Sequence, residues 1–218
     1  GRRDVDAARR AFGSAIGLVL ALALNSGIRR LRAVYRSAFY LPVITNIVAA
    51  AVIWQYAFTL KGPVNTFLAE LGLLGPNWLG DPNMAIGTVI LLTTWRNVGT
   101  CMVLFLAGLQ AIPEDVYEAA AIDGASAWRR FLSMTLPLLK PATVLVSVLM
   151  TVSYMNIFDE PYLLTKGGPL SATKSVALWV YEQFGHGNIA AAMAGSYVML
   201  AIVVLLGILQ LRMLRAWR

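Results

Sequence analysis

Side chains able to hydrogen-bond and stack against a polar solute interrupt three long apolar segments of this chain. Trp95, Arg96 and Asn97 are consecutive, and Arg96 is the only charged residue between Pro82 and Pro113. Amide and carboxylate groups hold sugars by hydrogen bonds, and aromatic faces pack against the C–H surface of the ring. The sequence therefore predicts a pathway for a polar solute, formed by Trp54, Trp95, Arg96, Asn97, Tyr154, Asn156 and Asp159.

Arg96 needs a partner if it lies inside a membrane, because an unpaired guanidinium there is costly. Asp159 and Glu160 are the two candidate counterions, and for Arg96 a structural ion pair and a contact with substrate both remain open. Trp54 stands near the end of its segment, so a place in the aromatic belt at the membrane surface is an alternative. Asp159 and Glu160 could equally face water at the outer end of theirs.

The segments that position these residues are long enough to cross a bilayer. Of the 218 residues, 58% are apolar and 13% charged, against roughly 45–50% and 25% in soluble domains. Disorder and a disulfide scaffold are excluded, since the chain is rich in Leu, Ile and Val and has one cysteine. About 20 apolar residues span the hydrocarbon core as a helix. We therefore predict an all-α, polytopic bundle with about five membrane helices, near residues 11–28, 38–60, 85–110, 141–163 and 190–211.

Charge predicts the orientation of these helices weakly, because Lys and Arg favour the cytoplasmic side. One orientation places ten Lys and Arg inside and the other seven. The first puts residues 112–140 in the cytoplasm. The net charge of +7 is thus mainly a topology signal, with contact to anionic lipid in addition, and nucleic-acid binding is not expected.

Residues 111–140 are too regular for a simple linker. Pro113 suits a first helical position, and the acidic residues after it stabilise the positive end of a helix. Gly124 can turn left-handed to stop that helix, and Ser126 can cap a second. The sequence predicts two short helices at an angle on the membrane surface.

This pair of helices has the properties of a docking surface. Three small residues, Ala119–Ala121, let another backbone come close, and Glu118 offers a charge to a partner arginine. An interfacial hairpin that merely connects two spans is the alternative.

The spacing of these residues resembles a known motif. Glu118-Ala119-Ala120, Gly124, Met134 and Leu136-Pro137 are similar to the EAA loop of ABC importer permeases, with Met134 where the family has isoleucine. Flanking segments resemble the carbohydrate branch of that family, the maltose and glycerol-phosphate type; they are residues 39–42, 77–82, 109–113, 122–126 and 164–169. The similarity runs from about Ala21 to the C-terminus. Because the family normally has six or more helices and the first ten residues do not fit, we expect a missing or divergent N-terminal region.

The resemblance implies a type I (MetI-like) permease fold, with residues 1–218 as one transmembrane domain and 111–140 as its cytoplasmic coupling loop. The loop would dock on an ATPase subunit through Glu118, Ala119, Ala120, Asp123 and Gly124. It further implies a second permease, an extracellular solute-binding protein and a multi-pass location in the cytoplasmic membrane. The sequence has no G-x-x-x-x-G-K-[ST] loop, so ATP and Mg²⁺ are expected on the partner rather than on this chain.

Three functions follow from these observations. Import of a sugar or oligosaccharide by alternating access is the leading hypothesis. Import of glycerol phosphate or another polyol phosphate is the alternative, in which Arg96 would pair with the substrate anion. An ion-coupled carrier or an embedded enzyme is disfavoured, because inverted repeats are not evident and His186 has no second metal ligand nearby.

Overall fold

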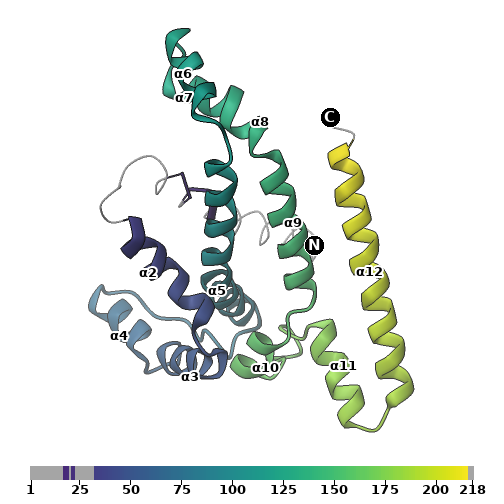
Figure 1. Ribbon diagram of the computed structural model, residues 1–218. Helices are drawn as coiled ribbons and strands as arrows, with labels where there is room; N and C mark the ends of the chain where they lie inside the picture. Colours follow the sequence, from purple (N-terminus) through teal and green to yellow (C-terminus); the bar gives the residue numbers. More distant parts are fainter. Residues whose placement is uncertain (1–16, 20, 23–31, 216–218) are drawn as a thin grey trace. The chain divides into compact units, whose positions relative to one another are not determined.

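The structure, a computed structural model, describes residues 17–19, 21–22 and 32–215, and every element in these ranges is helical (Figure 1). The first half contains α2 (Arg32–Ile44), α3 (Ile47–Ala57), α4 (Pro63–Glu70) and the long α5 (Pro82–Gln110). Next come α6 (Glu114–Ile122), α7 (Ala127–Arg130), the π-helix η1 (Phe131–Thr135) and α8 (Leu136–Leu138). The last four are α9 (Lys140–Met155), α10 (Asp159–Thr165), α11 (Val176–Gly185) and α12 (Ile189–Arg215).

The described residues form two compact units. The first contains residues 32–43, 97–150 and 208–215, and the second contains residues 44–96 and 151–207. Each has its own packed interior.

The first unit is packed around the C-terminal half of α5. Phe105, Met102 and Leu106 are fully buried there, as is Leu139 at the start of α9. Gly108 permits the close approach of α9, because a Cβ at this position would lie 2.5 Å from the Ala142 Cβ. These contacts fix the start of α9 against the end of α5.

The second unit is packed around the N-terminal half of α5. Val89 and Leu92 of α5 form a buried core with Leu164 of α10, and Trp54 and Trp95 pack against it. Two of the predicted pathway residues, Trp54 and Trp95, thus lie against an apolar core.

Among the described residues, two helices are long and apolar enough to cross a membrane, Pro82–Gln110 and Ile189–Arg212. They confirm the expected spans 85–110 and 190–211. Two bent pairs could each form a broken span, Ser37–Ile44 with Ile47–Ala57 and Ala127–Leu138 with Lys140–Met155. The described part of the chain therefore provides two to four spans, and most of the expected span 11–28 lies outside it.

The expectation of one helix over residues 38–60 is wrong. Its two halves, α2 and α3, meet at 100°. The Asn46 side chain accepts hydrogen bonds from the backbone N–H groups of Val48 (2.9 Å) and Ala49 (3.2 Å), so it caps a new helix at this point. Asn46 is thus the N-cap of α3.

The expectation of one helix over residues 141–163 is also wrong. The α9 helix ends at Met155, and α10 starts at Asp159. The Asn156 amide donates to the Val152 carbonyl at 2.8 Å, which satisfies a carbonyl at the end of α9. Pro161, near the start of α10, has no N–H with which to continue the earlier helix.

Candidate functional site

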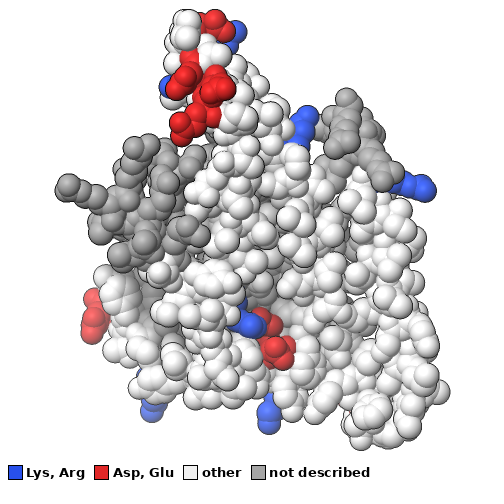
Figure 2. Space-filling view, in the orientation of Figure 1, with Lys and Arg blue, Asp and Glu red and all other residues white. Residues whose placement is uncertain are grey.

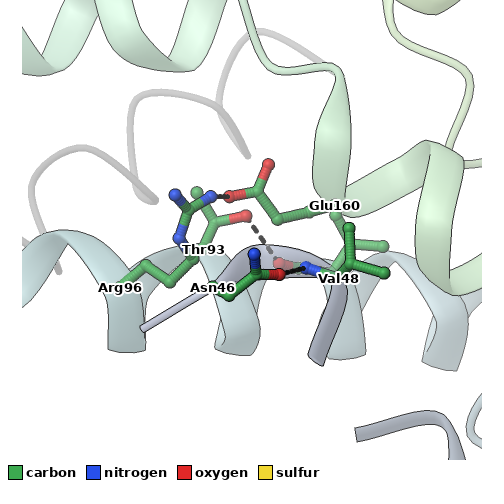
Figure 3. Close-up of polar contacts among 6 residues, drawn as sticks. Asn46, Val48, Thr93, Arg96 and Glu160 are labelled. Carbon is green, nitrogen blue, oxygen red and sulfur yellow. Dashed lines mark hydrogen bonds and ion pairs between the residues drawn. The ribbon is translucent and has the colours of Figure 1, made fainter. Parts of the chain in front are cut away.

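An ion pair joins α5 to α10 in the second unit. The Arg96 Nη1 donates to the Glu160 Oε1 at 2.8 Å, and the two side chains point toward one another (Figure 3). The Glu160 side chain is 7% exposed and that of Arg96 is 27% exposed. The predicted charge of Arg96 is therefore paired, and its counterion is Glu160 rather than Asp159.

The first turn of α10 positions Glu160. Asp159 and Glu160 open this helix, where the positive end of the helix dipole stabilises carboxylates. Gln55 of α3 fastens the other end of α10, because its Nε2 donates to the carbonyls of Leu163 (2.6 Å) and Leu164 (3.3 Å). Glu160 thus lies on a helix, α10, that is bonded to both α3 and α5.

Aromatic side chains line the same region. The Trp54 ring lies 5.8 Å from that of Trp95 and 5.2 Å from that of Phe58, measured between centroids. Phe58 in turn meets the edge of Trp78 at 5.4 Å. Two of the predicted pathway residues, Trp54 and Trp95, are therefore in contact, and Trp95 directly precedes Arg96 in α5.

The other predicted pathway residues are not gathered at this pair. Asn156 is exposed and bonded to the backbone of its own helix, Asp159 is exposed, and Tyr154 is half-buried. Asn97 follows Arg96 in α5 but belongs to the first unit. Glu160, one of the two expected counterions of Arg96, and Gln55 were not among the seven predicted pathway residues. In the sequence, Glu160 is indicated by its position next to Asp159. Gln55 is indicated by its amide side chain between two aromatic residues, Trp54 and Tyr56.

A second aromatic group lies at α10 and α11. Phe158, Tyr162 and Tyr181 are in mutual contact, with centroids 5.2 to 5.5 Å apart. A hydrogen bond with Tyr162 raises the pKa of the Tyr181 phenol above its ordinary value. Phe158 and Tyr181 also line an open, largely apolar cavity of about 560 Å³, together with Phe184 and Tyr197.

The predicted coupling loop forms a helical hairpin, α6 followed by α7. Gly124, at φ +70°, makes the left-handed turn that ends α6, and a Cβ there would meet no neighbouring atom. The Ser126 hydroxyl accepts from the Arg129 N–H at 3.3 Å and caps α7. Both expectations are confirmed. Pro113 stands one residue earlier than expected, as the N-cap of α6.

The hairpin exposes most of its predicted docking residues. Glu118, Ala119, Asp123 and Gly124 are exposed, whereas Ala120 is 1% exposed and packs inward. Helical periodicity turns the Ala120 side chain toward the protein, and its predicted docking role stays a prediction. Figure 2 shows acidic side chains gathered over α6, with basic side chains beside them, and α7 contributes Arg129 and Arg130.

Two large apolar side chains complete the exposed surface of the hairpin. Ile122 is 87% exposed and Trp128 is 69% exposed. The Tyr117 hydroxyl bonds the Thr135 hydroxyl at 3.1 Å, which ties α6 to η1. An acidic surface with exposed apolar residues on a tied hairpin is suited to binding another protein.

These features define a membrane permease, and comparison with known families identifies its kind. Residues 13–217 match the family described as "Binding-protein-dependent transport system inner membrane component". The chain belongs to this family and is a component of the inner membrane. The expected class, permease subunits of carbohydrate-type ABC importers, is confirmed.

Individual relatives are sugar permeases. The chain is 35% identical to the lactose transport system permease protein LacF of Rhizobium radiobacter over 89% of its length and 67% of the relative's. It is 37% identical to the trehalose/maltose transport system permease protein MalF of Thermococcus litoralis, over 90% and 67%. The arabinooligosaccharides permease AraP of Bacillus subtilis is 31% identical over 91% and 64%. The chain therefore spans about two thirds of these relatives.

Solved structures show the same fold. A bacterial ABC transporter that imports the acidic polysaccharide alginate matches with a TM-score of 0.78 and 21% identity, over 95% of this chain and 77% of that one. A bacterial alginate ABC transporter, in complex with an alginate pentasaccharide-bound periplasmic protein, matches with a TM-score of 0.85 and 23% identity, over 95% and 73%. The expected permease fold is thereby confirmed.

Proposed function

We propose that this chain is the membrane-spanning subunit of an ATP-driven importer that carries a sugar or oligosaccharide inward by alternating access. The observation that carries the proposal is the α6–α7 hairpin, on which Glu118 and Asp123 are exposed. Exposed charges are available for contact with another subunit. A hairpin of this kind suits transfer of motion from a cytoplasmic ATPase.

The ion pair and the tryptophans of the second unit provide the groups that can bind a sugar. The Arg96–Glu160 pair presents both a hydrogen-bond donor and an acceptor, and Trp95 supplies an aromatic face beside it. A sugar hydroxyl can donate to a carboxylate and accept from a guanidinium. The relatives named above carry lactose, trehalose, maltose and arabinooligosaccharides, which favours a sugar over the polyol phosphate alternative.

Four kinds of partner belong to this proposal. An ATPase subunit binds ATP and Mg²⁺ and docks on the hairpin, and a second permease completes the pathway. A solute-binding protein delivers the sugar, as the periplasmic protein in the complex with the alginate transporter suggests. Membrane lipid covers the outer helices, including α12, of which only 11% is buried within the chain in its apolar window.

Charge reversal at Glu118 tests the docking role. We expect Glu118→Arg to abolish co-purification of the ATPase subunit and ATP-dependent sugar uptake, because a carboxylate–cation contact becomes a repulsion. Assembly is measured by pull-down from membranes that express the complete transporter. Thermal unfolding of the permease should stay unchanged, since Glu118 is exposed and makes no contact that stabilises the fold.

The matched control is Glu70→Arg, a reversal at another exposed carboxylate, at the end of α4. This variant should assemble and transport as the wild type does. Normal assembly and uptake of the Glu118→Arg transporter would contradict the docking role of the hairpin.

A further inference from the structure

The Arg96–Glu160 pair brings two opposite charges to a region that is otherwise apolar. The surrounding core is formed by Val89, Leu92 and Leu164, and Arg96 is the only charged residue of α5. One oxygen of the Glu160 carboxylate is engaged at 2.8 Å. The pair therefore has no net charge while both groups are ionised.

A quarter of the Arg96 side chain remains accessible, while Glu160 is almost fully covered. A guanidinium exposed to lipid in the middle of a membrane helix is expensive, so the accessible part of Arg96 must face a polar interior or a partner subunit. Of the two side chains, Arg96 is therefore the more accessible to a solute.

We propose that Glu160 determines the charge selectivity of the pathway, by neutralising Arg96 so that anionic sugars and sugar phosphates are rejected and neutral sugars are accepted. This inference rests on the proposed function and refines its substrate class.

The energetic reason lies in the cost of displacing Glu160. An anion that binds Arg96 either stays beside the carboxylate, where like charges repel strongly in a medium of low dielectric, or takes its place. Displacement leaves a buried carboxylate without a partner, which is strongly unfavourable. A neutral hydroxyl can hydrogen-bond to either group without separating the pair. Discrimination therefore comes from a repulsive element as well as an attractive one.

Removal of the carboxylate charge tests the proposal. The transporter is purified with its partner subunits, reconstituted in nanodiscs without nucleotide, and titrated with glycerol phosphate in a calorimeter. We expect Glu160→Gln to bind this probe roughly tenfold or more tightly than the wild type, because Arg96 is then an uncompensated cation. The double variant Glu160→Gln with Arg96→Gln should lose this gain in affinity for glycerol phosphate.

An exposed carboxylate of the same unit provides the matched control. Glu70, at the end of α4, forms no ion pair among the described residues, so Glu70→Gln should bind glycerol phosphate as weakly as the wild type. Each variant is checked for a single gel-filtration peak. If Glu160→Gln does not fold, Glu160→Met replaces it as a neutral side chain of similar volume in the same titration.

Two results would overturn the proposal. One is a folded neutral variant at position 160 whose affinity for glycerol phosphate equals that of the wild type. The other is a double variant that keeps the gain, because the anion would then bind elsewhere. Uptake of a neutral sugar by the wild-type transporter tests the proposed function separately, so the two failures are distinguishable.

Discussion

The carboxylates of Glu160 and Glu118 occupy opposite environments in this molecule. Glu160 is buried, paired with Arg96 at 2.8 Å and held on a helix that Gln55 fastens. Glu118 lies exposed on α6 and forms no ion pair among the residues that the structure describes. The first environment makes a charge part of the fold, whereas the second leaves it free for a partner. Substitutions at the buried pair should therefore lower the stability of the fold, whereas substitutions at Glu118 should impair assembly with a partner.

The strongest test of this contrast removes the guanidinium. We expect Arg96→Met to lower the free energy of unfolding by about 3–5 kcal/mol, because Glu160 is left buried without a partner. Thermal unfolding of the purified permease in detergent measures the loss. The control is Lys174→Met, which breaks the half-buried Lys174–Glu182 pair, also 2.8 Å long, and should cost about 0–1 kcal/mol. Equal losses of unfolding free energy in both variants would show that burial does not determine how much an ion pair stabilises the fold.

A second test uses a neutral polar group in the same unit. The Asn65 amide donates to the carbonyls of Leu60 (3.2 Å) and Pro76 (3.1 Å) and accepts from the Trp78 indole at 2.7 Å. We expect Asn65→Ala to cost about 1–3 kcal/mol in unfolding free energy, since these partners lose their hydrogen bonds.

Asn77 is the comparison for Asn65, because it is exposed and its side chain accepts one bond, from Gly80 N–H at 2.9 Å. Asn77→Ala should change stability by less than about 1 kcal/mol. A loss at Asn77 as large as that at Asn65 would mean that the contacts of Asn65 do not anchor α4 and its loop.

The smallest expected effect lies in the hairpin. Gly124→Val places a branched side chain at φ +70°, which costs about 1–2 kcal/mol locally although the site has open space. Gly124→Asn, a residue that tolerates this backbone, should cost less. Hydrogen exchange of residues 119–130 compares the two variants. Equal protection in both would show that the backbone turn contributes nothing to the hairpin.

The hairpin was predictable from the sequence because its signals are local. Gly124 and Ser126 each act within a few residues, on a turn and on a cap, and both were predicted correctly. The long helices α5 and α12 were predictable for a similar reason, since an apolar run of sufficient length allows few other structures. The docking partner of this hairpin stays a prediction.

The broken segments and the ion pair depend on contacts that the sequence does not display. From the sequence, Asn46 could be a polar residue within a membrane span or the cap of a new helix. Only the direction of α3 in the structure distinguishes these two roles. Asp159 and Glu160 are adjacent, and which of them faces Arg96 depends on how α10 is rotated. That rotation is fixed by Gln55, a residue more than a hundred positions away.

The bend of 61° between Ala127–Leu138 and Lys140–Met155 has a mechanical consequence. Leu139 at this corner is completely buried. Ala142 lies so close to Gly108 of α5 that a Cβ at position 108 would be 2.5 Å from the Ala142 Cβ. Because this corner is closely packed, we expect a displacement of the helices that precede it to move α5 and α9 together.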